Sequence, residues 1–457
     1  MRGAVDTILD AVGPTPIVKL QRVGAELEAD LYVKCEYLQP SGSAKDRMAT
    51  RLVDAAEASG ALEPGGTIVE ATTGNTGAAL AMVAAVRGYK SLFVVSDKTS
   101  PEKVAALRAY GARVVVAPSA VEPDDPRSVT SVAARLAEET PQAFYARQFE
   151  SDENPGAHAD RTGAEIWEQT GGEVDAVVAP LGTGGTLVGI GRHLRGQPRD
   201  VALVGVDAVG SVYYDFVESG RVTQPFHYEL EGVGADFFPK TAALDLLDDI
   251  VRVDDGDAFR TTRDLVRLEG LFVGGSSGAA VAGAIAWARR AGGARNVLVV
   301  LPDGAGSYLS KIFNDEWMRE HGFLEAESGL GTVRELLTQK GGEGVITAKA
   351  TDRVRDVVGR MKAHGISQLP VMGDDGLLGA VAEVDLLRYL VSGESSLEGP
   401  VEPLVESDYA TVSPQTRIES LQALLNEAKM AIVLEDDRIA GVVTKIDLID
   451  YLARRAS

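Results

Sequence analysis

Cysteine is almost absent from the sequence, since Cys35 is the only one among 457 residues. A single cysteine excludes an intrachain disulfide bond and any zinc cluster that is built from cysteines. Histidine is scarce too, and the five histidines never fall at the spacing of an H-E-x-x-H motif. The pattern therefore predicts no metal site.

Long apolar runs and an excess of positive charge are missing as well. No apolar stretch approaches the ~18–20 residues that a membrane-spanning helix needs, and the start of the sequence lacks the apolar core and cleavage pattern of a signal peptide. With 45 Lys and Arg against 67 Asp and Glu, the formal net charge is −22, whereas phosphate backbones are bound mainly by Lys and Arg. We therefore expect a cytoplasmic protein that binds neither membranes nor nucleic acids.

Residues 1 to about 325 are rich in glycine and alanine. Short apolar runs that are typical of buried parallel strands, at 174–180, 202–207 and 296–302, alternate with alanine-rich helical patterns. This alternation predicts an α/β fold with helices on both faces of a sheet. Ligands of such folds bind beyond the carboxyl ends of the strands, where the loops that lead into the helices meet.

An internal repeat fills the last part of the chain. Residues 379–390 match residues 441–452 at an offset of 62, and each copy predicts a helix, a strand, a turn, a strand and a helix. Because a solenoid needs three or more units, two copies indicate a pseudo-symmetric pair with one shared core. The expected organisation is a first domain over 1–325, a linker over 326–332 and two repeat domains over 333–395 and 401–457.

Four loops of the first part combine glycine with chemistry-bearing side chains. The loop 40–47 (PSGSAKDR) brings Lys45 to a predicted helix start. Taken alone, Lys45 is best explained as a solvated surface residue, and the functional alternative is a lysine that binds an aldehyde cofactor. The loop 70–77 (EATTGNTG) ends a strand and opens a helix, where hydroxyls and free N–H groups suit a carboxylate. The same residues would also make an ordinary helix cap and tight turn.

The other two loops are richer in glycine. The loop 182–186 (GTGGT) follows a predicted strand, and its glycines let backbone N–H groups approach a phosphate. It lacks the lysine of a Walker A loop and the third glycine of G-x-G-x-x-G, so a turn without a ligand is the alternative. The loop 274–278 (GGSSG) offers a buried hydroxyl to a ring nitrogen, or else its serines only cap a helix.

In this order and in these contexts, the four loops resemble those of the β-family (fold type II, tryptophan synthase β-like) of pyridoxal-phosphate enzymes. Within it the chain is similar to the cystathionine β-synthases, since residues 231–239 (EGVGADFFP) resemble their E-G-x-G-x-D-F-x-P segment. Residues 302–318 resemble the segment that closes their catalytic core, and the C-terminal repeat resembles their paired CBS domains, a Bateman module. The resemblance covers nearly the whole chain.

The resemblance implies a role for each loop. Lys45 would bind pyridoxal phosphate covalently and act as the base for the α-proton, Asn75 would contact the ring hydroxyl oxygen, and Ser276 would meet the pyridine nitrogen. A neutral serine there, unlike an aspartate, would not keep the nitrogen protonated, which favours β-elimination. The phosphate would be bound by Gly182, Thr183, Gly184, Gly185 and Thr186, and the amino-acid carboxylate by Thr72, Thr73, Thr76 and Gln148.

The implied reaction condenses L-serine with L-homocysteine to give L-cystathionine and water, so small amino acids and thiols are the expected partners. A cysteine synthase-type replacement, with O-acetylserine or serine and sulfide or another nucleophile, stays open. Thr73 replaces the usual serine, Ala235 stands where the synthases often have tyrosine, and Gly306 stands where arginine is common. A catalytically silent metabolite sensor is the third alternative. No haem is expected, because the catalytic pattern starts almost at Met1.

The repeat resembles adenosyl-ligand sensors, so S-adenosylmethionine or an adenine nucleotide is its expected ligand. Thr444 and Asp447 of the second copy match the residues that support and bind the ribose, whereas the first copy keeps Asp385 but has Ala382. Alternatively, Asp447 is only a helix N-cap, and the pair serves to assemble a homodimer or homotetramer.

Overall fold

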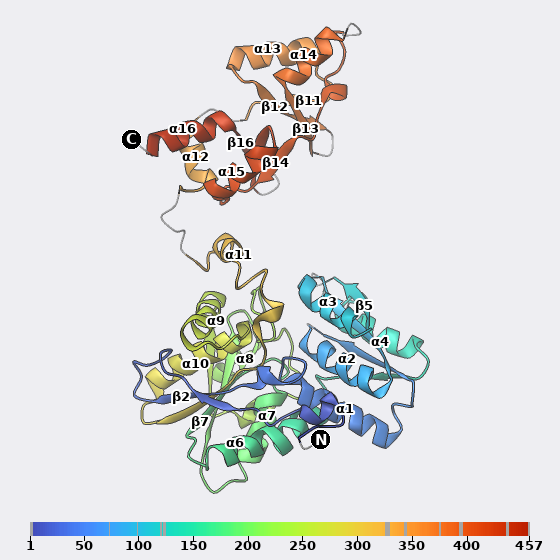
Figure 1. Ribbon diagram of the computed structural model, residues 1–457, viewed down its shortest axis with the longest axis vertical. Helices are drawn as coiled ribbons and strands as arrows, with labels where there is room; N and C mark the ends of the chain where they lie inside the picture. The colour runs from blue at the N-terminus through green and yellow to red at the C-terminus, as the bar shows by residue number, and fades with distance from the viewer. Residues whose placement is uncertain are drawn as a thin grey trace. The chain divides into compact units, whose positions relative to one another are not determined.

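The chain folds into two compact units, Met1–Leu324 and Glu325–Ser457 (Figure 1). The computed structural model describes residues 3–72, 74–97, 99–118, 121, 125–324, 330–341, 345–373, 376–392, 396–435 and 438–455. Residues 326–329 of the expected linker lie outside this set. The α/β fold that the sequence predicts for the first unit is confirmed.

The larger sheet of the first unit has six strands. Its order is β1-β2-β10-β7-β8-β9, and every pair is parallel except β1 with β2. The strands are β1 (Ile17–Lys19), β2 (Asp30–Lys34), β7 (Ala176–Pro180), β8 (Ala202–Ala208), β9 (Asp249–Val253) and β10 (Asn296–Val300). The three apolar runs of the sequence are thus confirmed as β7, β8 and β10.

The first unit also contains helices and short helical turns outside the segment 45–139. They are η1 (Ile8–Ala11), η2 (Glu36–Leu38), α5 (Glu153–Ala157), the π-helix η3 (His158–Gly163), α6 (Ala164–Gln169), α7 (Gly185–Leu194), α8 (Tyr213–Ser219), η4 (Leu244–Leu246), α9 (Asp255–Glu269), α10 (Gly275–Ala291), η5 (Ala305–Ser307) and α11 (Asp315–Glu320). Small residues let α10 approach the sheet closely: a Cβ at Gly283 would lie 2.5 Å from a methyl carbon of Val206 in β8. This close approach accounts for the Ala/Gly-rich pattern of the helix.

The smaller sheet has four parallel strands in the order β5-β4-β3-β6. The strands are β3 (Thr67–Ala71), β4 (Lys90–Ser96), β5 (Arg113–Ala117) and β6 (Ala143–Tyr145), and the helices around them are α1 (Lys45–Ser59), α2 (Asn75–Arg87), α3 (Pro101–Ala109) and α4 (Val129–Glu139). Its core buries Ile68 and Phe93 completely, together with the alanine-rich face of α2. Every strand of this sheet therefore ends on the same edge, toward which the loops after β3 and β6 run.

The second unit contains the repeat. The first copy has α12 (Val333–Lys340), β11 (Ala348–Lys349), α13 (Val354–His364), β12 (Gln368–Gly373), β13 (Gly376–Ala382) and α14 (Glu383–Val391). The second has η6 (Glu402–Leu404), β14 (Tyr409–Val412), α15 (Ile418–Glu427), β15 (Met430–Glu435), β16 (Arg438–Thr444) and α16 (Lys445–Arg455). Both hairpins are antiparallel and carry a register shift at matching positions, Val371/Met372 and Val433/Leu434. The repeat is thereby confirmed.

The core of the pair differs from the expected single core. Each copy has a core of its own, and a smaller cluster of Ala380, Met430 and Ile432 joins the two. The helix α12 is the first element of the first copy, yet its Val333 and Leu336 are buried in the core of the second. Among the described residues, no helix has both the length and the apolar character that crossing a membrane requires.

Candidate active site

The four predicted loops come together at the carboxyl ends of strands from both sheets. Thr72 follows β3, Gly182 follows β7 by two residues, and Asp303 follows β10 by three. The loop before α1 is held against the loop after β10, because the Ala44 N–H donates to the Pro302 carbonyl (2.8 Å) and the Gly304 N–H to the Gly42 carbonyl (3.1 Å). Lys45 is therefore brought beside Asp303.

Lys45 is the first residue of α1 and is half-buried. Burial lowers the pKa of its amine, and the negative charge of Asp303 works in the opposite direction. Among the described residues, none forms a hydrogen bond or ion pair with Nζ of Lys45. An amine with a lowered pKa and no fixed partner can act as a nucleophile and as a base.

Asn75 and Ser276 converge on Asp303, a buried carboxylate to which sequence reasoning assigned no role. The amide Nδ2 of Asn75 donates to Oδ2 (2.8 Å), and the Ser276 hydroxyl donates to Oδ1 (2.9 Å). Tyr308 adds a third donor, since its hydroxyl lies 2.6 Å from Oδ2. The sequence offered two signals for Asp303, namely its position directly after a predicted strand and its place in the segment 302–318 that resembles the end of the family's catalytic core.

Thr72, Thr76 and Gln148 lie together on the other side of the loop after β3. Oγ1 of Thr72 accepts hydrogen bonds from the N–H groups of Gly74 (3.0 Å) and Gly77 (3.2 Å). The Thr76 hydroxyl donates to Oε1 of Gln148 (2.6 Å), whose amide donates to the Ala71 carbonyl (2.9 Å). The fourth predicted member of this set, Thr73, lies outside the described residues.

Glu70 lies beneath this group and was missed by sequence reasoning. Its side chain is fully buried at the end of β3, and burial raises its pKa to about 8, although the N–H groups of Gln148 and Ala71 work against this. Alternation along a buried strand gives no signal that separates a functional carboxyl from a structural one.

The loop 182–186 forms a cradle at the start of α7. Glycine is needed there for space: a Cβ at Gly182 would lie 2.7 Å from the Gly232 carbonyl oxygen, and one at Gly185 would overlap the Asn154 side chain. Gly184 also has a φ of +77°, which favours glycine. The free N–H groups of a helix start and the hydroxyls of Thr183 and Thr186 suit a phosphate group.

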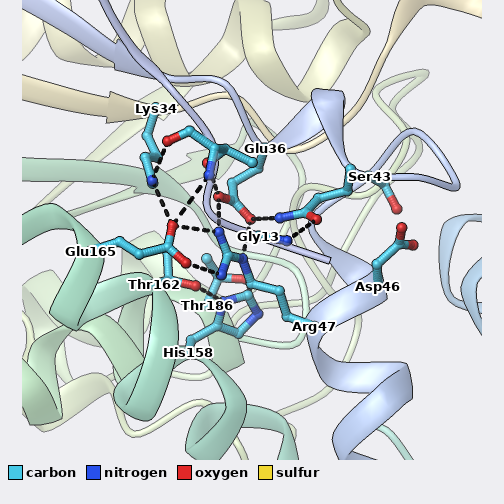
Figure 2. Close-up of polar contacts among 12 residues, drawn as sticks. Gly13, Lys34, Glu36, Ser43, Asp46, Arg47, His158, Thr162, Glu165 and Thr186 are labelled. Carbon is cyan, nitrogen blue, oxygen red and sulfur yellow. Dashed lines mark hydrogen bonds and ion pairs between the residues drawn. The ribbon is translucent and has the colours of Figure 1, made fainter. Parts of the chain in front are cut away.

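His158 contacts the cradle from behind (Figure 2). Its Nε2 lies 3.2 Å from Oγ1 of Thr186 and its Nδ1 lies 2.9 Å from Oγ1 of Thr162. Burial, together with the charges of Arg47 and Lys45, holds the pKa of His158 well below its usual range. The ring is therefore neutral and fixed by two hydroxyls.

A buried ion network fixes the first turn of α1, two residues beyond Lys45 (Figure 2). Arg47 pairs with Glu36 (2.7 Å from Nε to Oε2) and with Glu165 (2.6 Å from Nη1 to Oε1), and Lys34 also pairs with Glu165 (2.7 Å). Two acids face two bases, so the buried charges balance. Such a network contributes little to the net free energy of folding, but moving one of its members away would leave a buried charge without a partner.

The predicted ligand residues of the repeat are already engaged. Thr444 donates to Oδ2 of Asp447 through its N–H (2.8 Å) and its hydroxyl (2.7 Å), and Nζ of Lys340 lies 2.9 Å from the same oxygen. Asp447 is the third residue of α16 rather than its N-cap, yet it caps this helix, because it accepts the N–H of Thr444 directly before it. For Asp385 of the first copy, Nζ of Lys429 from the second copy lies 3.1 Å from Oδ1.

Comparisons with known proteins agree with this division of the chain. The model of the pyridoxal-phosphate dependent enzyme family matches residues 8–303, and the CBS domain model matches residues 333–392 and 401–454. A cystathionine beta-synthase of Dictyostelium discoideum is 34% identical over 467 residues, which cover 98% of this chain and 93% of that protein. A cystathionine beta-synthase of Saccharomyces cerevisiae is 32% identical over a match that covers 98% of this chain and 97% of that protein.

Two further relatives match the first unit. A cysteine synthase of Staphylococcus aureus is 39% identical over 307 residues, which cover 67% of this chain and 96% of that protein. The crystal structure of O-ureido-L-serine synthase superposes with a TM-score of 0.63 at 37% identity and covers 71% of this chain and 98% of its own.

Proposed function

The chain belongs to the pyridoxal-phosphate-dependent enzyme family and carries a C-terminal pair of CBS domains, and on this premise we propose that it condenses L-serine with L-homocysteine. The reaction is a β-replacement that yields L-cystathionine and water. The span of the similarity supports this choice, since the Dictyostelium discoideum cystathionine beta-synthase matches 98% of the chain and the Staphylococcus aureus cysteine synthase 67%. An enzyme of this family is not the silent sensor that the sequence left open.

The residues of the site fit pyridoxal phosphate. Lys45 offers an amine with a lowered pKa, the cradle offers a glycine-lined helix start with two hydroxyls, and Asn75 and Ser276 offer polar groups on one side of the site. When bound, the cofactor supplies an electron sink for the negative charge that develops at the substrate α-carbon.

Lys45 moves the proton in this proposal. Its lowered pKa leaves a larger fraction of the amine unprotonated near neutral pH, so that it can take the proton from the α-carbon of serine. The buried network of Arg47 holds the turn that carries Lys45 in one position. The same amine returns the proton when the product is complete.

The substrate carboxylate is bound by Thr72, Thr73, Thr76 and Gln148. Because Oγ1 of Thr72 already accepts two backbone N–H groups, its own proton is free to donate to the carboxylate. In the free site the Thr76 hydroxyl donates its proton to Gln148. It donates to the substrate carboxylate instead when the substrate binds. Charge-assisted hydrogen bonds of this kind are stronger than those between neutral groups.

A cysteine synthase-type replacement is the second candidate. Within the first unit, this candidate is supported by the 39% identity to the Staphylococcus aureus cysteine synthase and the 37% identity to O-ureido-L-serine synthase. Steady-state kinetics with L-serine or O-acetylserine as donor, and L-homocysteine or sulfide as acceptor, separate the two. The proposal requires the highest kcat/KM for the pair of L-serine and L-homocysteine.

For the second unit, the proposal includes a regulatory adenosyl ligand, S-adenosylmethionine or an adenine nucleotide, at Thr444 and Asp447. The second copy has both the hydroxyl and the carboxylate, already hydrogen-bonded to each other. The first copy has Ala382 in place of the threonine, so one ligand per pair is expected.

The proposed assembly is a homodimer or homotetramer. Both copies of the repeat expose apolar side chains at matching positions, Val384 and Leu387 on α14 and Ile446 and Ile449 on α16. Exposed apolar residues that recur at the spacing of one helix face are typical of protein contact surfaces. This recurrence supports assembly through the second unit.

A further inference from the structure

We propose that Asp303 is a positioning residue that aims Asn75 and Ser276 together at the cofactor ring. The inference rests on the proposed roles of those two residues and adds a third group through which they act. Asp303 lies in the segment 302–318 that resembles the end of the family's catalytic core, but that resemblance assigned it no role.

The geometry is that of one acceptor with three donors. Oδ2 of Asp303 accepts from Asn75 (2.8 Å) and Tyr308 (2.6 Å), and Oδ1 accepts from Ser276 (2.9 Å). Asp303 and Ser276 are 2% and 3% exposed, so water does not compete for these bonds. A carboxylate has acceptor atoms only, so the side chain of Asp303 can serve all three donors at once.

The carboxylate fixes the orientation of the Asn75 amide. Since Asp303 only accepts, the amide must turn its NH2 group toward it and its oxygen away. One N–H is used on Asp303, and the second is left to donate to the ring hydroxyl oxygen. With no acceptor at this place the amide could turn over and present its own oxygen to that hydroxyl oxygen.

Ser276 is fixed by the same group. Its only proton is donated to Oδ1 of Asp303 in the free site, which sets the rotamer of the side chain. The hydroxyl would turn this proton to an unprotonated ring nitrogen when the cofactor binds. The two residues that are assigned to the ring are therefore both held by one carboxylate in the free site.

The surroundings of Asp303 are built around it. A Cβ at Gly274 would lie 2.5 Å from Oδ1 of Asp303 and 2.5 Å from Cε2 of Tyr308. Gly274 has a φ of −88°, a value that any residue adopts. Glycine is therefore needed here because a Cβ would collide with the Asp303 carboxylate and not because of the backbone conformation. The N–H of Gly274 also donates to the Asp303 carbonyl (3.0 Å).

The test is binding of pyridoxal phosphate to the full-length apoprotein, with no substrate present. Asp303→Asn keeps the size of the side chain but makes one of its two acceptor atoms a donor, so at least one of the three partners loses its bond. The dissociation constant is expected to rise about tenfold or more, with a shifted absorption maximum of the bound cofactor. Gly274→Ala, which displaces the carboxylate sterically, is expected to act in the same direction.

The matched control is Ser277→Ala. Ser277 is as buried as Ser276, but its hydroxyl donates to the backbone carbonyl of Asp303 (3.3 Å) and not to the carboxylate. This variant is expected to bind the cofactor within about twofold of the wild type. Thermal unfolding of each apoprotein shows whether a variant is folded. If Asp303→Asn does not fold, Gly274→Ala takes its place in the test.

A double-mutant cycle identifies the route of the effect. Asp303→Asn is expected to lose most of its effect on the dissociation constant in the Asn75→Ala, Ser276→Ala background. An undiminished effect there, or an unchanged dissociation constant and spectrum in the single variant, overturns the inference. Unaltered binding by Asn75→Ala and Ser276→Ala instead contradicts the proposed site, and a different substrate pair changes none of these results.

Discussion

Lys340 donates a hydrogen bond to Asp447, with 2.9 Å between Nζ and Oδ2. Asp385 of the first copy has a similar partner from the second copy, since Nζ of Lys429 lies 3.1 Å from its Oδ1. In both copies, the acid that the resemblance assigns to a ribose is thus bound to a lysine. A ligand must displace that lysine, which lowers its apparent affinity by the free energy of the displaced contact.

Replacing Asp447 tests the regulatory site. Asp447→Ala removes the proposed acceptor for the ribose hydroxyls, so the dissociation constant of S-adenosylmethionine, measured by calorimetry, is expected to rise about tenfold or more. The control is Asp450→Ala, an exposed acid one turn later in α16 that pairs with Arg454. Unchanged affinity in the Asp447 variant places the ligand elsewhere.

Lys45→Ala removes the residue that is proposed both to bind the cofactor and to act as the base. The rate of product formation is expected to fall by roughly a thousandfold or more, and the protein is expected to lose its bound cofactor on dialysis. Lys90→Ala, at the exposed start of β4, is the control for loss of a lysine. Wild-type turnover in the Lys45 variant would remove that residue from the mechanism.

Glu70 predicts a dependence of stability on pH. Burial raises its pKa from 4.5 to about 8, so the folded state binds a proton between these values that the unfolded state has released. Its contribution is therefore greatest below about pH 4.5 and is lost as the pH rises toward 8. The loss is on the order of a few kcal/mol.

The measurement compares Tm across this range for the wild type and Glu70→Gln. The difference, wild type minus variant, is expected to become steadily more negative between pH 5 and 8, because the variant has no proton to lose. Glu139→Gln, on the exposed end of α4, is expected to follow the wild type. Parallel curves for wild type and Glu70→Gln would show that the buried group does not titrate.

The exposed apolar positions of the repeat predict a change in assembly. Leu387→Asp combined with Ile449→Asp places charges on both copies, so sedimentation is expected to give a smaller species than the wild type. The control is Val222→Asp, which changes an equally exposed valine in the first unit. An unaltered mass of the double variant would move the contact to another surface.

Most of the site could be predicted because its residues are local. Lys45, Asn75 and Ser276 each stand in a short glycine-rich loop between a strand and a helix, where spacing along the chain carries the signal. Parallel strands bring such loops to one edge, so the sequence order of the loops also predicts that they meet.

The missed residues depend on contacts that sequence spacing does not encode. Asp303 is bonded to Asn75 and Ser276, which are 228 and 27 positions away. His158 reaches the cradle from a π-helix, 28 positions before Thr186. The packing of α12 into the second copy of the repeat is of the same kind, because its Val333 and Leu336 are buried among residues that lie far along the chain. Long-range pairings of this sort are fixed by the fold and leave no local pattern.

One competition experiment tests the central claim most directly. The enzyme, loaded with pyridoxal phosphate, receives L-serine together with equal concentrations of L-homocysteine and sulfide, and the products are identified by mass spectrometry. The account predicts L-cystathionine as the dominant product, with neither product formed by Lys45→Ala. Cysteine as the dominant product would contradict it.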